Sequence, residues 1–177
     1  GIGAHFAKVA AAAGAKVVLG ARRTDLLDGI VAEIEAAGGK AIAVAMDVAD
    51  KASTLAAYDA AEAALGPVDS VIANAGMDAH TPFLNLEPEE FDRLMSVNLR
   101  GVFLTVQEGA RRMMAAGSKE RQHGRIVIIS SITAQTIEPG LAPYSASKAG
   151  VLQMGKVLAR EWANRGINVN MVLPGYI

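Results

Sequence analysis

The chain has 177 residues, of which 51% are hydrophobic, and its formal net charge at pH 7 is −1. This length suits one domain with a sizeable core, and the near-neutral charge gives no electrostatic footprint for nucleic acid or an anionic membrane. The chain contains no cysteine, which excludes disulfides and thiolate metal sites. The three histidines, His5, His80 and His123, lack the spacing of metal ligands, so we expect no metal.

The apolar stretches are too short to cross a membrane. The richest of them, residues 7–21, is interrupted by Lys8, Gly14 and Lys16 and is typical of a helix followed by a strand. We therefore expect no membrane partner and a cytoplasmic protein. Because the chain opens on Gly1 without a methionine, we also expect an N-terminal piece to be missing.

Helical and strand-like segments alternate along the chain. Thr24 can cap the start of the second helix, and Gly38 and Gly39 can end it. The polar residues 117–124 are expected to form a loop, and Arg111 and Arg112 to lie at the solvated end of a helix. Helices are predicted over residues 3–13, 24–39, 51–65, about 88–116 and 144–164, and strands over 16–20, 41–47, 68–76, 125–130 and 167–175.

This rhythm predicts an α/β fold with a doubly wound parallel sheet and helices on both faces, formed as one domain over residues 1–177. RIVIIS (125–130) is almost continuously apolar, as expected of a strand covered on both faces. Sheets of this kind bind ligands at the carboxyl ends of their strands. Those ends carry small, polar or turn-forming residues: GAR (20–22), MDV (46–48), ANAG (73–76), ISS (129–131) and LPGYI (173–177).

Tyr144 and Lys148 are four residues apart, which places them on one face of a helix. An ammonium beside a phenol stabilises the phenolate and favours proton transfer near neutral pH. Ser131, at a strand end, can hydrogen-bond a substrate oxygen. The same tyrosine–lysine spacing also occurs on ordinary amphipathic helices, so the pair alone does not establish catalysis.

Further motifs resemble those of the short-chain dehydrogenase/reductase family. They follow the family's order and cover essentially the whole chain, which is far more specific than a lone GxG. These motifs are GIG (1–3), similar to the end of the T-G-x-x-x-G-x-G cofactor loop; ANAG (73–76), similar to N-N-A-G with Ala73 for the first asparagine; SVNLRG (96–101) around Asn98; YSASK (144–148), similar to Tyr-x-x-x-Lys; and PGYI (174–177), similar to the Pro-Gly turn.

The resemblance implies a Rossmann fold and a nicotinamide-dependent oxidoreductase. Tyr144 would be the acid when a carbonyl is reduced and the base when an alcohol is oxidised. Lys148 would assist Tyr144 and bind the nicotinamide ribose. Ser131 would polarise the substrate oxygen; it precedes Tyr144 at the family's usual interval, which favours it over Ser130. Asn98 would hold a water in a proton relay that reaches Lys148.

The resemblance also implies a set of cofactor-binding residues. Glycines let a backbone approach a pyrophosphate, and a helix N-terminus favours its charge. The first strand, the start of the cofactor loop and the family's C-terminal substrate lid are absent, so we expect the chain to be incomplete at both ends. The implied contacts are Gly1, Ile2 and Gly3 for the phosphates, Asp47 and Val48 for the adenine, Asn74, Ala75 and Gly76 for the ribose, and Pro174, Gly175 and Ile177 for the nicotinamide.

The cofactor type can be inferred from the end of the second strand of the family's sheet. NAD enzymes usually carry an acid there, whereas this chain has Ala21 followed by Arg22 and Arg23. Arginine can make a charge-assisted contact to a 2′-phosphate. NADP(H) is therefore the preferred cofactor; NAD(H), with both arginines on a solvated loop, is the alternative.

These observations predict an NADP(H)-preferring oxidoreductase that moves hydride between nicotinamide and a carbonyl/secondary alcohol substrate. Two alternatives stay open: a 3-oxoacyl-carrier-protein reductase and a non-catalytic nucleotide-sensing regulator. The family often forms tetramers, and we expect a homotetramer built through the helices after Asn98 and after Tyr144. Four polar residues fall near the expected substrate mouth, Asp78, His80, Gln135 and Glu138.

Overall fold

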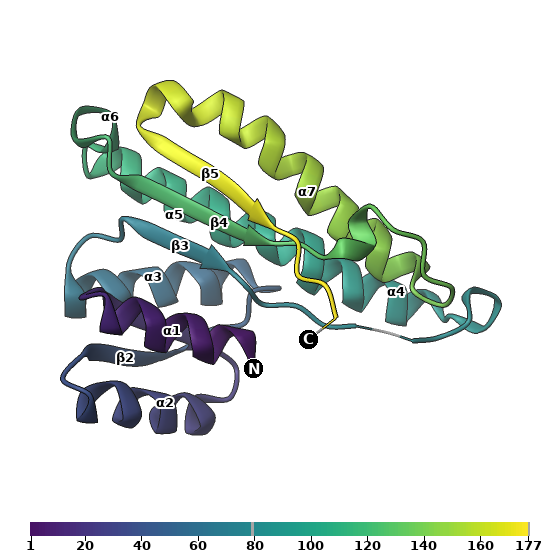
Figure 1. The fold of residues 1–177 in the computed structure, drawn as a ribbon, viewed down its shortest axis with the longest axis horizontal. Coiled ribbons are helices and arrows are strands. Elements are labelled where there is room, and N and C mark those ends of the chain that lie inside the picture. The colour runs from purple at the N-terminus through teal and green to yellow at the C-terminus, as the bar shows by residue number, and fades with distance from the viewer. Residues whose placement is uncertain (79, 177) are drawn as a thin grey trace. The chain divides into compact units, whose positions relative to one another are not determined.

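Every strand pair in the computed structural model is parallel, which confirms the α/β class predicted from the sequence. The structure describes residues 1–78 and 80–176. The chain forms two units, Gly1–Val68 and Asp69–Ile177, each with its own sheet (Figure 1). That the whole chain forms a single domain stays a prediction, and each unit is described by itself.

The N-terminal unit is a two-stranded parallel sheet with three helices packed on it. Its strands pair in register from Lys16 with Lys40 to Ala21 with Ala45. Leu19, Leu27 and Ile34 form the centre of its core. The elements in chain order are α1 (Ile2–Ala12), β1 (Lys16–Ala21), α2 (Thr24–Ala36), β2 (Lys40–Ala45) and α3 (Lys51–Leu65).

The helix ends in this unit agree with the sequence at their C-termini but not at the start of α2. Gly14 and Gly38 follow α1 and α2 with φ of +90° and +82°, a conformation that glycine adopts without strain. The prediction that Thr24 caps α2 is wrong: Arg23 occupies the N-cap position without a side-chain cap bond, and Thr24 is already helical. Asp50 caps α3, accepting a hydrogen bond from Ala52 N.

The C-terminal unit is a three-stranded parallel sheet in the order β3-β4-β5, with the apolar segment predicted from RIVIIS as its central strand. Ile126, Ile128 and Ile129 of this strand are buried. Helix α5 packs on β3 and β4, and α7 on β4 and β5 (Figure 1). The main elements are β3 (Ser70–Ala73), α4 (Pro88–Met95), the π-helical segment η2 (Ser96–Gly101), α5 (Val102–Ala115), α6 (Ser118–Arg121), β4 (Gly124–Ile129), α7 (Ala142–Trp162) and β5 (Ile167–Val172).

Short 3-10 segments complete this unit: η1 (Phe83–Asn85), η3 (Ile132–Ala134) and η4 (Ala163–Arg165). Within the residues described, no helix is long and apolar enough to span a bilayer.

Two segments differ from the expected secondary structure. The helix predicted over 88–116 is interrupted by the π-helical segment η2. The predicted loop 117–124 contains α6, because the buried Ser118 hydroxyl donates to Arg165 O at 2.7 Å. Gly166 makes this contact possible: its φ is +71°, and a Cβ there would lie 2.0 Å from Ser118 O.

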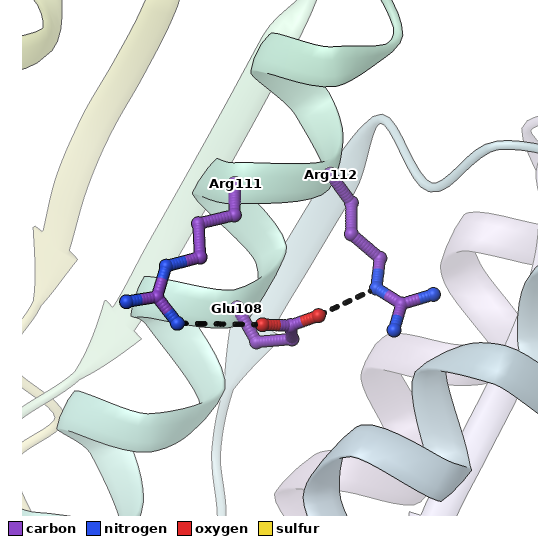
Figure 2. A network of polar contacts seen from close by, with 3 residues as sticks. All are labelled: Glu108, Arg111 and Arg112. Carbon is purple, nitrogen blue, oxygen red and sulfur yellow. Dashed lines mark hydrogen bonds and ion pairs between the residues drawn. The ribbon is translucent and has the colours of Figure 1, made fainter.

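The end of α5 is only partly solvated, contrary to the sequence-based expectation. Figure 2 shows the Glu108 carboxylate between two arginines of the same helix. Arg112 Nε lies 2.7 Å from Glu108 Oε1, and this side chain is only 18% exposed. Arg111 Nη1 lies 3.8 Å from Glu108 Oε2 and is 60% exposed. The expectation of a solvated helix end therefore holds for Arg111 and is wrong for Arg112.

This difference predicts unequal effects of removing the two arginines. Arg112→Met should lower the free energy of unfolding by about 1–3 kcal/mol, because it removes a charge-assisted hydrogen bond shielded from solvent. Arg111→Met is the matched control and should change it by less than ~0.5 kcal/mol. Urea unfolding of both variants measures the difference, and equal losses would contradict it.

Candidate active site

The first two turns of α7 bring Tyr144 and Lys148 together, as the four-residue spacing predicts. Lys148 Nζ lies 5.7 Å from the centroid of the Tyr144 ring, within cation–π range. The Lys148 side chain is only 4% exposed, and Nζ donates to Ile129 O at 2.9 Å. Burial lowers the pKa of Lys148 from lysine's ordinary value, because desolvation disfavours the charged form. The half-buried Tyr144 thus has an ammonium held beside its ring.

The carboxyl end of β4 is attached to α7 twice at Lys148. In addition to the bond from Nζ to Ile129 O, the Ser130 hydroxyl donates to Lys148 O at 2.8 Å. These two bonds hold the next residue, Ser131, beside α7. The hydrogen of the Ser130 hydroxyl is thereby engaged by the backbone of α7. It is then not free for a substrate oxygen, the role that the sequence analysis predicts for Ser131.

Ser131 is a buried residue at the N-cap of η3, and its hydroxyl oxygen is fully engaged as an acceptor. Thr133 N donates to Ser131 Oγ at 3.2 Å, and Thr133 Oγ1 donates to it at 2.9 Å. Within the described residues, the Ser131 hydroxyl has no acceptor of its own. Since a serine hydroxyl has two acceptor sites and one hydrogen, this geometry favours Ser131 as a donor to a ligand oxygen. The sequence analysis did not identify Thr133.

Asn98 is fully buried in the π-helical segment, and its amide pairs with one backbone residue. Met77 N donates to Asn98 Oδ1, and Asn98 Nδ2 donates to Met77 O, both at 2.8 Å. The second Nδ2 hydrogen goes to Ser147 Oγ at 3.1 Å, and Ser147 donates in turn to Tyr144 O at 2.7 Å. The sequence analysis did not identify Met77 or Ser147 as part of this site.

Gly76 lies against both Asn98 and Lys148. A Cβ at this position would lie 3.4 Å from Lys148 Nζ and 3.5 Å from Asn98 Oδ1. The loop after β3 therefore presents backbone rather than a side chain to these two polar groups. Asn74 is half-buried, and Ala75 and Gly76 are exposed.

The Pro-Gly segment after β5 lies beside Ser131. Ile132 N donates to Pro174 O at 2.9 Å, so the end of the last strand is tied to η3. Gly175 is exposed. Ile177, the remaining residue predicted for nicotinamide binding, lies outside the described residues.

The other predicted cofactor residues lie in the N-terminal unit. Gly1 is exposed, and Ile2 and Gly3 form the start of α1. Asp47 Oδ1 accepts a hydrogen bond from Ala49 N, which orients that carboxylate, and Val48 is half-buried. Both arginines after β1, Arg22 and Arg23, are exposed and make no ion pair or side-chain hydrogen bond within the part of the chain that is described.

Among the described residues, no group of three or more histidine or acidic side chains could hold a metal ion. Farther along the two segments that follow Ser131 and Pro174, Tyr176 Oη donates to Glu138 Oε2 at 2.8 Å. This hydrogen bond and the charge of Glu138 raise the pKa of Tyr176. A carboxylate is thus held between the segment that follows Ser131 and the segment that follows Pro174.

Comparison with known proteins gives a match over the whole chain. A family model described as short chain dehydrogenase matches residues 1–177. Gluconate 5-dehydrogenase of Gluconobacter oxydans is 37% identical over 176 residues, which are 99% of this chain and 67% of that protein. A 3-oxoacyl-[acyl-carrier-protein] reductase of Synechocystis sp. is 37% identical over 178 residues, covering 100% of this chain and 70% of that protein.

The solved structures include a gluconate 5-dehydrogenase from Burkholderia cenocepacia J2315 in complex with NADP and tartrate. It is 36% identical, with a TM-score of 0.91 over 99% of this chain and 67% of that one. The chain thus spans about two thirds of the length of these relatives. The structural match confirms the Rossmann-like α/β fold predicted from the sequence.

The buried ammonium predicts a pH-dependent stability difference between wild type and Lys148→Met. The folded pKa of Lys148 lies below lysine's ordinary 10.5, so the unfolded chain binds the proton more tightly and the charge penalises the folded state near neutral pH. This penalty disappears as the pH rises toward 10.5. Wild type should therefore gain stability relative to Lys148→Met between pH 7 and 10.

Urea unfolding of both proteins at several pH values measures this difference. The variant also loses the hydrogen bond to Ile129 O, but a neutral amine makes that bond too, so the pH dependence isolates the charge. A stability difference that is constant with pH, or that moves in favour of the methionine variant, would contradict the prediction.

Proposed function

This chain belongs to the short-chain dehydrogenase/reductase family, and from this premise we propose that it is an NADP(H)-preferring oxidoreductase that acts on a carbonyl/secondary alcohol pair. The observation that supports the proposal best is the buried Lys148 ammonium beside the Tyr144 ring. A buried charge is expensive to hold, and such groups are concentrated where proteins carry out chemistry.

The residues around Lys148 fit a nicotinamide nucleotide. An ammonium has three N–H donors, and within the described residues Lys148 uses one, toward Ile129 O. Two donors are therefore left for hydroxyl groups such as those of a ribose. The exposed Ala75 and Gly76 add no bulky side chain, so a ligand can approach the backbone there. When bound, NADP(H) supplies or accepts the hydride.

The remaining chemistry is polarisation of an oxygen and transfer of a proton. We assign Ser131 as the hydrogen-bond donor to the substrate oxygen, because Thr133 occupies its acceptor sites. We assign Tyr144 as the group that gives the proton to this oxygen in reduction and removes it in oxidation. The Lys148 ammonium lies beside the ring of this proton donor, with Nζ 5.7 Å from the ring centroid.

The hydrogen bonds of the Asn98 amide limit how this side chain could hold a water in a proton relay. Both amide hydrogens are used, by Met77 O and by Ser147 Oγ. A water held by this side chain can therefore only donate to Oδ1, which faces the same side of Gly76 as Lys148 Nζ. We propose that Asn98 Oδ1 accepts a hydrogen bond from such a water, and that this water links Asn98 to Lys148 in the proton relay.

The preference for NADP(H) is supported by Arg22 and Arg23. Both guanidinium groups are exposed just after β1, where arginine can pair with a 2′-phosphate. The relative from Burkholderia cenocepacia that was crystallised with NADP adds to this support.

Two substrate types are suggested by the relatives, gluconate and a 3-oxoacyl group on a carrier protein. Residues 132–143, between Ser131 and Tyr144, carry a single charged side chain, Glu138. This carboxylate would repel the anion gluconate as well as an acidic carrier protein, so its charge does not discriminate between the two substrate types. A non-catalytic nucleotide sensor remains the alternative of another class, and the substitution of Tyr144 tests it.

Tyr144→Phe should lower turnover by at least ~100-fold, because it removes the proton that general acid catalysis requires. Binding of NADPH, followed by nicotinamide fluorescence, should change little. The test is made on the full-length protein, with a panel of carbonyl substrates for reduction and alcohols for oxidation. Turnover that survives the substitution would exclude the assigned role of Tyr144, and wild-type protein that binds NADPH but turns over no substrate would favour the sensor.

Arg22→Ala should weaken NADPH binding by about tenfold or more and leave NADH binding nearly unchanged, because only NADPH carries the 2′-phosphate. Fluorescence titrations with both nucleotides measure this, and Arg23→Ala shows whether the second arginine shares the contact. Lys40→Ala, which removes an exposed cation at the amino end of β2, is the control. Equal losses for both nucleotides would contradict the preference for NADP(H).

A further inference from the structure

The Ser147 hydroxyl links two of the residues assigned above, Asn98 and Tyr144. It accepts a hydrogen bond from Asn98 Nδ2 at 3.1 Å and donates one to Tyr144 O at 2.7 Å. The side chain is 0% exposed, so both hydrogen bonds are shielded from bulk water. A hydroxyl is needed for this pattern, because one group must both accept and donate.

The chain of hydrogen bonds begins at the loop after β3. Met77 N–H donates to Asn98 Oδ1, and Met77 C=O accepts from Asn98 Nδ2. The backbone of Met77 thus fixes the positions of the oxygen and the nitrogen of the Asn98 amide. That orientation directs the second Nδ2 hydrogen at Ser147. Each donor in such a chain polarises the next, which strengthens the series in a buried site.

The last acceptor in the chain is part of the turn that spaces Tyr144 from Lys148. In a regular α-helix the carbonyl of residue 144 accepts from the amide of residue 148, and α7 is helical throughout Ala142–Trp162. The Ser147 hydroxyl therefore holds the carbonyl group of Tyr144, to which the backbone amide of Lys148 also donates in a regular helix. A shift at this point would move the phenol relative to the ammonium.

We propose that Ser147 is a positioning residue for the reaction: its hydroxyl joins the Asn98 amide to the Tyr144 carbonyl and so fixes Tyr144 relative to the loop after β3. The proposal rests on the proposed function for its kinetic consequence. It assigns a role to a side chain that touches neither substrate nor cofactor.

Ser147→Ala should lower kcat by about tenfold, because groups that orient a reacting residue contribute through geometry. The dissociation constant for NADPH should stay within about twofold of wild type, since in the proposal Ser147 holds no part of the cofactor. A role in stability alone would lower the unfolding midpoint and leave kcat unchanged.

Ser118→Ala is the matched control for the loss of a buried hydroxyl. Ser118 is 1% exposed and donates to a backbone carbonyl at 2.7 Å, as Ser147 does, but from α6 to Arg165. It should shift the urea midpoint by an amount similar to Ser147→Ala while kcat stays within about twofold of wild type. Equal kinetic effects of the two substitutions would overturn the proposal.

A double-mutant cycle with Asn98→Ala tests whether the effect runs through the hydrogen-bond chain. If it does, Ser147→Ala should have little further effect on kcat once Asn98 is removed, since the chain is already broken. Fully additive losses would overturn the link. Ser118→Ala combined with Asn98→Ala should be additive.

The same cycle measured by urea unfolding separates failure of this inference from failure of the proposed function. Wild-type protein that turns over no carbonyl or alcohol with either nucleotide defeats the proposed function. The Ser147–Asn98 contact is then judged by the unfolding midpoints. Additive shifts for this pair would overturn the hydrogen-bond chain, and non-additive shifts would support it.

Discussion

The candidate site depends on one constraint, which is that a lysine ammonium is held almost out of solvent. Placing Lys148 there costs several kcal/mol unless polar partners surround the charge. The backbone carbonyl of Ile129 is the partner that the fold supplies. The strand that ends at Ile129 must therefore stay against α7, and the Ser130 hydroxyl secures the same junction from the other side. The contact between this strand and α7 therefore provides the polar partner that the Lys148 ammonium needs.

A second feature of the site is its set of buried and hydrogen-bonded polar side chains. Asn98, Ser130, Ser131, Thr133 and Ser147 are all buried, and each has a partner. Buried polar groups of this kind specify a single arrangement, because any displacement leaves a donor or acceptor unpaired. The π-helical segment around Asn98 fits this picture, since π-bulges often occur where a helix has to turn one residue toward a functional site.

The sequence was sufficient for features that depend on neighbouring residues. The helix over 51–65 and the apolar central strand could be predicted because their signals are local. The contacts of Asn98 could not be, since they join residues 21 and 49 positions apart. Helix α6 was missed because Ser118 is held by a carbonyl 47 residues away. The prediction of a cap at Thr24 was wrong although its signal is local. Threonine is favoured at N-cap positions, but here the helix begins at Thr24 itself.

The segment YSASK illustrates what helix geometry adds to a motif. Positions i, i+3 and i+4 lie on one face of a helix, so residues 144, 147 and 148 point to the same side of α7. Tyr144 and Lys148 occupy two of these positions. A search for ionisable residues alone finds these two and no third. The third position carries a small polar residue that is fully buried, and buried hydroxyls are usually hydrogen-bonded. The same rule that relates Tyr144 to Lys148 thus also marks Ser147 as a residue with a partner, and only the structure shows that the partner is Asn98.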